Sequence, residues 1–341
     1  MSEPLLDVRD LRVGFTPGRE RRSRSAAPAR SLLFAVDGVS FVVRPGEAVA
    51  LVGESGSGKT TVGRALLRLV PAQGGRVLYT PAAPGTRLDL LRAGGRELRR
   101  VRRDLQVVFQ DSLGSLNPRH AVGRIVGEAL AVHHLARRGV RERRVLRLLE
   151  RVGLPRDAVG RRPHELSGGQ RQRVAIARAL AVEPRFVVLD EVTSALDVPV
   201  QAEVVNLLAD LKQELGLAYL LISHDLALVG QVADRVLVMS LGRLVESGTA
   251  EDVFERPAHP YTRALLAARP SLDPAAPRPP VLVGEPPSPL DPPRGCSFHP
   301  RCPLAEERCR TVDPREPTRL SETHDAACHL AAAEDSGRAS P

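Results

Sequence analysis

One short segment of the chain has the pattern of a phosphate-binding loop. Residues 53–60 read Gly-Glu-Ser-Gly-Ser-Gly-Lys-Thr, which fits G-x-x-x-x-G-K-[ST]. In such a loop, successive backbone N–H groups point into one concavity at a helix N-terminus and hold phosphate oxygens. Lys59 would reach the β- and γ-phosphates, and the Thr60 hydroxyl would ligate Mg²⁺. The pattern therefore predicts nucleotide binding by Gly53, Ser55, Gly56, Ser57, Gly58, Lys59, Thr60 and Thr61.

Two carboxylates follow a strongly apolar stretch later in the chain. Residues 186–189 read Phe-Val-Val-Leu, and Asp190 and Glu191 come directly after them. Ligands of parallel α/β sheets bind at the carboxyl ends of the strands, so both carboxylates should face the phosphates. Asp190 suits Mg²⁺ coordination, and Glu191 suits polarising a water molecule for attack on the γ-phosphate. The alternative is a solvated acidic pair that merely ends a strand.

Two further polar residues follow predicted strands. Gln110 comes after the apolar stretch 105–109, and its amide oxygen can ligate Mg²⁺ or orient a water molecule. His224 comes after the stretch 218–223 and could donate a hydrogen bond to the γ-phosphate. Either residue alone would be explained as an ordinary strand end or cap. Four polar residues expected at one sheet edge favour a catalytic site.

The elements that must position these residues follow an α/β pattern. Strand patterns occur at 5–15, 35–43, 47–52, 76–80, 105–109, 186–189, 218–223, 235–239 and 244–246. Helical spacing of apolar residues occurs at 61–70, 122–134, 141–152, 170–182 and 200–215. Strands separated by helices predict a largely parallel sheet, and the helices inserted before residue 169 predict a helical subdomain.

Composition narrows the class of protein. The chain has 341 residues, 43% of them hydrophobic, and carries a net charge of +9. Aromatic residues make up only 3% and Trp is absent, which disfavours a nucleic-acid partner that stacks bases. The basic segment 16–31 is expected to be a solvated loop, with contact to lipid head groups as the alternative. No stretch approaches the length of a membrane span, and the first ten residues lack the pattern of a signal peptide, so we expect a cytoplasmic protein.

Taken in order, these motifs resemble those of the ATP-binding-cassette (ABC) ATPases. The resemblance equates Gly53–Thr60 with the Walker A loop, Gln110 with the Q-loop, Leu166–Gln170 with the signature, Phe186–Asp190 with Walker B, Glu191 with the catalytic glutamate, Ser194–Asp197 with the D-loop and His224 with the switch histidine. It implies an α/β fold with a mostly parallel core sheet, an antiparallel β subdomain and an inserted α-helical subdomain. It also implies ATP and Mg²⁺ as cofactors.

In that family two cassettes meet head to tail, so that the signature of one completes the nucleotide site of the other. The resemblance therefore adds Ser167, Gly168, Gly169, Gln170 and Asp197 to the nucleotide site. Phe15 resembles the aromatic residue that stacks on adenine, although a structural phenylalanine in the core or at a strand edge is the alternative. Val192 stands where relatives usually have proline, which gives up a fixed φ after Glu191.

Three further segments, 107–119, 259–266 and 284–296, resemble the ATPases of bacterial dipeptide and oligopeptide importers, in particular the second of their two ATPase subunits. That resemblance implies a motor at the cytoplasmic face of the membrane. It also implies a sister ATPase, two permeases and an extracytoplasmic binding protein as partners. An importer of nickel or glutathione, or an ATPase subunit of a carbon–phosphorus lyase-like complex, is the alternative. The sequence does not identify the cargo.

The C-terminal part differs in composition from the rest. It is rich in proline after residue 269 and holds Cys296, Cys302, Cys309 and Cys328 in the spacing C-x5-C-x6-C-x18-C. Four thiolates suit zinc or an iron–sulfur cluster, and the cytosol disfavours disulfides. The importer resemblance implies a [4Fe–4S] cluster, while a zinc site that includes His299, His324 or His329, or four structural thiols, stays open. Because this part has little core of its own, we expect metal to organise it.

These observations predict three regions. Residues 1–255 would form the cassette, with the helical subdomain at about 111–169. Residues 256–335 would form the C-terminal extension, and residues 336–341 a disordered tail.

Overall fold

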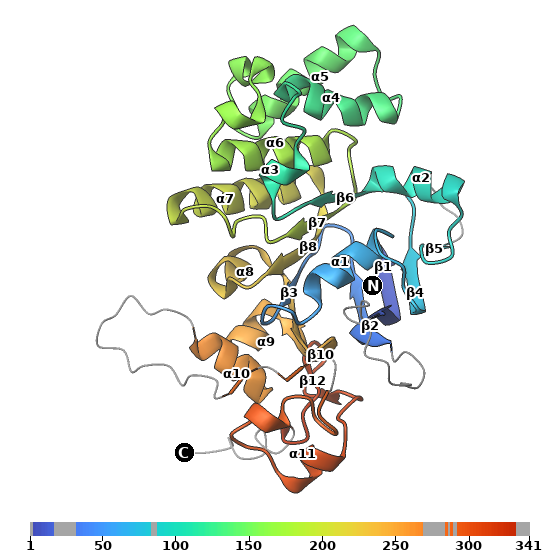
Figure 1. Cartoon of the computed structure of the whole chain (residues 1–341), viewed down its shortest axis with the longest axis vertical. Coiled ribbons are helices and arrows are strands. Elements are labelled where there is room, and N and C mark those ends of the chain that lie inside the picture. The colour runs from blue at the N-terminus through green and yellow to red at the C-terminus, as the bar shows by residue number, and fades with distance from the viewer. Residues whose placement is uncertain are drawn as a thin grey trace, which may run out of the picture. The chain divides into compact units, whose positions relative to one another are not determined.

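The computed structural model describes residues 3–16, 32–82, 87–268, 284–285, 287–288 and 292–331. Most of the basic segment 16–31 and the tail 336–341 lie outside the described residues. The chain divides into two compact units, whose elements are labelled in Figure 1. The first unit comprises Met1–Leu6, Val43–Ala50 and Tyr79–Ala233, and the second comprises Asp7–Val42, Leu51–Leu78 and Asp234–Pro341.

The first unit is built on parallel strands, as the sequence predicts. Strands β6, β7 and β8 pair in parallel, and the first residues of β3 lie beside β8. All residues of β7 and β8 are buried, which explains why both strands are continuous apolar runs. The strands of this sheet in the first unit are β3 (Ala48–Val52), β6 (Leu105–Val108), β7 (Phe186–Asp190) and β8 (Ala218–Ser223), whereas the two-residue strand β5 (Leu88–Asp89) belongs to another sheet.

Helices precede and follow these strands. Helix α4 packs against α5 and α6 in the group that Figure 1 draws in green, and it buries Val122, Ile125, Val126 and Leu130 on one face. The helices are α2 (Gly95–Asp104), α3 (Ser112–Ser115), α4 (Val122–Val132), α5 (Arg138–Arg151), α6 (Gly168–Leu180), α7 (Val198–Leu215) and α8 (Leu226–Val232), with the 3-10 helices η1 (Arg156–Gly160) and η2 (Pro163–Glu165). The expected helical segments 122–134, 141–152, 170–182 and 200–215 therefore correspond to α4, α5, α6 and α7.

The second unit contains two sets of strands. Strands β1 (Leu6–Phe15), β2 (Leu33–Val43) and β4 (Gly74–Tyr79) lie in the order β2-β1-β4. Strands β9 (Arg235–Ser240) and β10 (Arg243–Thr249) form an antiparallel hairpin next to the last residues of β3. Its two turn residues, Leu241 and Gly242, have φ values of 44° and 83°, as a type I′ turn requires. Helix α1 (Lys59–Leu66), helix α9 (Ala250–Glu255) and helix α10 (Pro260–Ala267) complete this part.

The C-terminal extension adds to the sheet of the second unit. Strand β12 (Asp325–Ala326) pairs antiparallel with β10, and β11 (Thr318–Arg319) pairs with β12. The extension also contains η3 (His299–Arg301) and α11 (Glu307–Thr311). We expected metal to organise this part of the chain. The structure identifies a second source of order, because the extension docks on β10 and buries Phe298 and Ala326.

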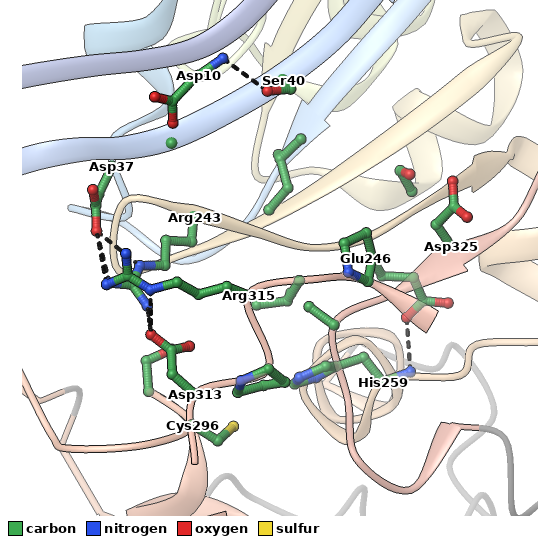
Figure 2. Close-up of a pocket in the computed structure, with 18 of the residues that line it drawn as sticks. Asp10, Asp37, Ser40, Arg243, Glu246, His259, Cys296, Asp313, Arg315 and Asp325 are labelled. Carbon is green, nitrogen blue, oxygen red and sulfur yellow. Dashed lines mark hydrogen bonds and ion pairs between the residues drawn. The ribbon is translucent and has the colours of Figure 1, made fainter. Parts of the chain in front are cut away.

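Charged side chains reinforce this docking. Arg243 of β10 forms ion pairs with Asp37 of β2, at 2.6 Å, and with Asp313 of the extension, at 2.5 Å, as Figure 2 shows. These residues line a cavity of about 340 Å³ between the strands and the extension.

No described helix of the chain is long and apolar enough to cross a membrane.

Glu246 of β10 is the most deeply buried carboxylate at this junction, with an exposed fraction of 1%. It accepts hydrogen bonds from the backbone N–H groups of Ala258, at 2.8 Å, and His259, at 2.9 Å. Nε2 of His324, in the extension, lies 2.8 Å from Glu246 Oε1, the oxygen that also accepts from the Ala258 amide. One carboxylate thus joins β10, the start of α10 and the extension.

We therefore expect Glu246→Ala to lower the free energy of unfolding by about 3 kcal/mol, because it leaves several buried donors without an acceptor. Urea unfolding followed by circular dichroism would measure the change. The exposed Glu255 is the control, and Glu255→Ala should change stability by less than about 0.5 kcal/mol. Equal effects of the two substitutions would contradict a structural role for Glu246.

Candidate functional site

The predicted phosphate loop connects β3 to α1 in the second unit. The helix begins at Lys59, with Gly58 as its N-terminal cap at φ 105°, so the loop ends at a helix N-terminus. The loop is tied down by the Gly242 amide, which donates to the Ser57 carbonyl at 2.9 Å. Ser55 and Gly56 are exposed, while Thr60 and Thr61 are half-buried in the first turn of α1. The arrangement is the strand, glycine loop and helix that the pattern requires.

Two glycines of this loop touch other backbone segments. A Cβ atom on Gly53 would lie 2.1 Å from the Met239 carbonyl oxygen, and one on Gly58 would lie 2.2 Å from the Ala35 carbonyl oxygen. Both glycines also have positive φ values, of 150° and 105°. Any side chain at either position would therefore collide with main chain that cannot swing away.

Lys59 lies across the concavity of the loop. Its exposed fraction is 5%, and its Nζ donates to the carbonyl oxygens of Gly53 and Glu54, both at 2.8 Å, and to Ser57 Oγ at 3.4 Å. An ammonium group held in this way places a buried positive charge where the pattern expects phosphate oxygens. Phosphate oxygens would offer this ammonium charged acceptors in place of neutral carbonyls.

The predicted catalytic residues come together in the first unit, at the carboxyl end of β7. Gln110 Nε2 donates to one Glu191 oxygen at 2.7 Å, and His224 Nδ1 lies 3.4 Å from the other. Asp190, the last residue of β7, is buried with an exposed fraction of 5%. The carboxylate of Glu191 is therefore held between an amide and an imidazole that arrive from the neighbouring strands β6 and β8.

The backbone of Glu191 adopts a conformation that non-glycine residues rarely take. Its φ is 47°, which costs on the order of 1 kcal/mol. Its amide donates to the Ile222 carbonyl at 2.9 Å, and its carbonyl accepts from the Ser194 hydroxyl at 2.9 Å. Val192 beside it is buried, with an exposed fraction of 3%. Strain retained at one residue is typical of functional sites, where the surrounding contacts enforce it.

The predicted signature lies at the N-terminus of α6. Ser167 caps this helix by accepting from the Gln170 amide at 3.2 Å, and the Gln170 side chain accepts from the Ser167 amide at 3.1 Å. The helix begins at Gly168, two residues before the start that the sequence predicts, because this capping box fixes its first turn. A Cβ atom on Gly169 would lie 2.4 Å from Val200 Cγ1, which explains the glycine there.

The remaining predicted nucleotide contacts lie at the surface. Asp197 is exposed at the N-terminal cap position of α7. Phe15 ends β1 with an exposed fraction of 43%, so it is not a core phenylalanine. Its stacking on adenine stays a prediction.

The four cysteines lie in the extension and form no disulfide. The pKa of Cys296 is raised to about 11, mainly by burial and to a smaller degree by the charges of Cys328, Cys309 and Cys302. Among the described residues, however, no group of three or more His, Cys, Asp or Glu side chains has the arrangement of a metal site.

The three histidines of the alternative zinc site have other contacts. His324 is paired with Glu246, and His329 Nε2 lies 2.9 Å from the Val312 carbonyl oxygen. His299 Nδ1 lies 3.0 Å from the Cys296 carbonyl oxygen. Each of these contacts engages one ring nitrogen and leaves the other for a different partner, so the alternative of a mixed cysteine and histidine site stays open.

Sequence reasoning missed one residue inside the phosphate loop. Glu54 occupies a position at which the pattern allows any residue. Its carboxylate nevertheless pairs with Arg301 of the extension, and its amide donates to the Tyr261 hydroxyl of α10. Its partners, Tyr261 and Arg301, are remote in sequence. The available signal was an acidic residue at a place that must bind an anion.

The glycine contacts lead to a test of the loop. Gly58→Ala should sharply reduce the amount of folded protein or its unfolding midpoint, because it adds a backbone collision to an unfavourable φ. Gly56 is the matched control, since it also has a positive φ, of 79°, but a Cβ atom added there would meet nothing within 4 Å. Gly56→Ala should cost only about 1–2 kcal/mol. Equal losses in a denaturant titration would contradict the close approach at Gly58.

Comparison with known proteins agrees with these features. A family model described as "ABC transporter" matches residues 36–194, and a model described as "Oligopeptide/dipeptide transporter, C-terminal region" matches residues 245–309. The oligopeptide transport ATP-binding protein OppF of Salmonella typhimurium is 46% identical over 91% of this chain and 92% of its own length. The di/tripeptide transport ATP-binding protein DppF of Pseudomonas aeruginosa is 44% identical over 96% of this chain and 98% of its own.

Solved structures give the same result. The dimeric, post-hydrolysis ATP-binding cassette MJ0796 bound to ADP and phosphate matches with a TM-score of 0.60 and 27% identity, over 72% of this chain and 98% of that one. CbiO1 of Clostridium perfringens, part of an ABC transporter complex, matches with a TM-score of 0.62 and 27% identity, over 75% of this chain and 92% of that one. With its two family matches and its close full-length relatives, the chain belongs to the ATP-binding proteins of ABC transporters, in the branch that has the oligopeptide/dipeptide transporter C-terminal region.

Proposed function

We propose that this protein is the ATP-hydrolysing motor subunit of a bacterial ABC importer for di- or oligopeptides. The proposal rests on the position of Glu191, whose two carboxylate oxygens contact Gln110 and His224 at the end of a buried strand. The phosphate loop and its buried Lys59 supply the other requirement, an anion-binding helix N-terminus. The names of OppF and DppF favour peptides over nickel or glutathione as cargo.

Each residue then has a defined task. The loop amides and Lys59 bind the β- and γ-phosphates of ATP, and Phe15 stacks on the adenine. Glu191 accepts a proton from the attacking water molecule, while His224 donates a hydrogen bond to the γ-phosphate. The products are ADP and phosphate.

The expected magnesium ligands are oxygen donors, which suit this cation. They are the Thr60 hydroxyl, the Gln110 amide oxygen and the Asp190 carboxylate. Gln110 directs its amide nitrogen to Glu191, so its oxygen is the atom that suits a cation. When bound, Mg²⁺ neutralises charge that develops on the β- and γ-phosphate oxygens.

The signature and its neighbours belong to the partner's nucleotide. Ser167, Gly168 and Gly169 begin α6 and present the positive end of a 13-residue helix, which would bind a phosphate across the dimer. Gln170 completes the capping box, and Asp197 stands at the start of α7. The matched cassette MJ0796 is described as dimeric. We propose a sister ATPase as the second cassette.

This motor would work at the cytoplasmic face of the cell membrane, as a peripheral protein. Its partners would be two permeases, and indirectly an extracytoplasmic binding protein that delivers peptide. Residues 1–255 would act as the cassette, with residues 111–169 meeting the permeases, and residues 256–335 as the extension. The relatives named as transport ATP-binding proteins support this assembly.

Glu191→Gln tests the hydrolytic mechanism. It should preserve MgATP binding but lower ATP turnover about 100-fold or more, because an amide cannot accept the proton. Phosphate release and equilibrium binding of a fluorescent ATP analogue measure the two properties. Glu214→Gln, at an exposed position of α7, should leave both unchanged. Near-normal turnover in Glu191→Gln would assign the base elsewhere.

We further propose that the four cysteines ligate a [4Fe–4S] cluster. The chemistry of the donors fits, since each thiolate can bind one iron, and the four thiols interact within one small extension. Such a cluster would crosslink the loops that contain Cys296 and Cys309, which are already joined by a backbone hydrogen bond of 2.9 Å. Zinc is the alternative occupant.

Anaerobically purified protein should then contain about four irons and four sulfides per chain and be coloured, as expected of such a cluster. Cys309→Ser should lose most of the iron, whereas Ser297→Ala, beside Cys296, should keep it. Iron, acid-labile sulfide and absorbance assays decide the matter. Colourless protein with one zinc per chain would replace the cluster with a zinc site.

A further inference from the structure

Arg301 of the C-terminal extension contacts Glu54 in the phosphate loop. Arg301 donates from Nη1 to Glu54 Oε2 and from Nη2 to Glu54 Oε1, both at 2.8 Å, which is a bidentate ion pair. The Arg301 side chain has an exposed fraction of 6% and the Glu54 side chain one of 27%. A pair shielded from water to this degree is a stronger constraint than a surface ion pair.

A second contact fixes the main chain of the same residue. The Glu54 amide donates to the Tyr261 hydroxyl at 2.8 Å. Tyr261 belongs to α10 and is fully buried, and its ring packs edge-on against Phe298 at a centroid distance of 5.4 Å. The loop residue is therefore held by its amide through Tyr261 and by its carboxylate through Arg301.

Arg301 is itself placed by the cysteine-containing part of the extension. It ends η3, directly before Cys302, and its amide donates to the Phe298 carbonyl at 3.0 Å. The hydrogen bond to Glu54 is the main cause that raises the pKa of Arg301 above its ordinary value, so the guanidinium stays charged. The fold of the extension thus determines where this positive charge lies.

The charge of Glu54 explains why the contact matters. A carboxylate within a loop that binds a triphosphate repels it, and the repulsion at short range in a half-buried site is substantial. Glu54 also presents its carbonyl oxygen to Lys59 Nζ, at 2.8 Å, so a shift of Glu54 would move the lysine contact as well. Arg301 both neutralises this carboxylate and fixes its position.

We propose that Arg301 and Tyr261 are positioning residues of the nucleotide site, through which the C-terminal extension sets the affinity of the phosphate loop for ATP. This inference rests on the proposed ATP-binding function. It gives the extension a role in nucleotide binding that its separate position in the sequence does not suggest. Neither residue has to touch the nucleotide.

A double-mutant cycle on Glu54 and Arg301 in the full-length protein tests the proposal. In a Glu191→Gln background, Arg301→Gln should weaken MgATP binding about 10-fold or more, because Glu54 is left uncompensated. Glu54→Gln should weaken MgATP binding less, because it removes the ion pair without leaving an uncompensated carboxylate in the loop. The double variant Glu54→Gln/Arg301→Gln should recover to within about threefold of Glu54→Gln, because the unpaired charge is gone.

A role in stability alone would produce a different pattern. The double variant would then bind as weakly as Arg301→Gln or worse, and that result would overturn the proposal. Unchanged affinity in Arg301→Gln would overturn it too. Arg310→Gln is the control, since Arg310 is an exposed arginine of the same extension that pairs only weakly, with Glu307 at 3.9 Å. Failure of the parent protein to bind MgATP would instead refute the proposed function.

The kinetics give an independent readout in the protein with Glu191 intact. Arg301→Gln should raise KM for ATP while kcat at saturating ATP stays within about twofold, because the catalytic groups are untouched. Tyr261→Phe, which removes only the hydroxyl, should raise KM by a few-fold in the same direction. A fall in kcat with unchanged KM in both variants would contradict positioning of the phosphate loop.

Discussion

The parallel register of β6, β7 and β8 is the constraint on which the cluster of candidate catalytic residues depends. Val108 pairs with Leu189, and Asp190 pairs with Ile222, so the three strands end at nearly the same level. Gln110, Glu191 and His224 each follow a strand end by one or two positions, and their side chains consequently meet. A slip of one residue would reverse the faces of the strand and separate them. Every residue of β7 and β8 is in the core, so close packing against both faces of these strands resists such a slip.

The phosphate-binding half depends on a different constraint, the approach of main chain to main chain. Gly53 and Gly58 lie where the carbonyl groups of Met239 and Ala35 leave no room for a side chain. The loop is therefore shaped by strands that are far from it in sequence as well as by its own glycines. Its helix N-terminus and the buried ammonium of Lys59 then provide the positive potential that phosphate requires. ATP hydrolysis in general needs both an anion-binding loop and a carboxylate that can polarise water.

The C-terminal extension is joined to the rest of the second unit by specific contacts. Strand β12 pairs with β10, Glu246 joins three segments through one buried carboxylate, and Arg301 pairs with Glu54 inside the phosphate loop. These contacts join the cysteine-bearing loops to the phosphate loop by way of one short 3-10 helix. The extension is thus packed into the second unit and is not a separate tail.

Most of the fold and much of the site could be predicted from the sequence, because local signals specify them. The glycine spacing of the phosphate loop, the apolar run before Asp190 and the capping residues of α6 each act over a few neighbouring residues. Tertiary structure alone decided the role of Glu54 and the pairing of β12, since a two-residue strand has no periodicity and an ion pair across 247 positions leaves no local pattern. The same holds for the left-handed backbone of Glu191, which the Ile222 and Ser194 contacts impose. Sequence determined which chemical groups are available, and packing between distant segments determined which of them meet.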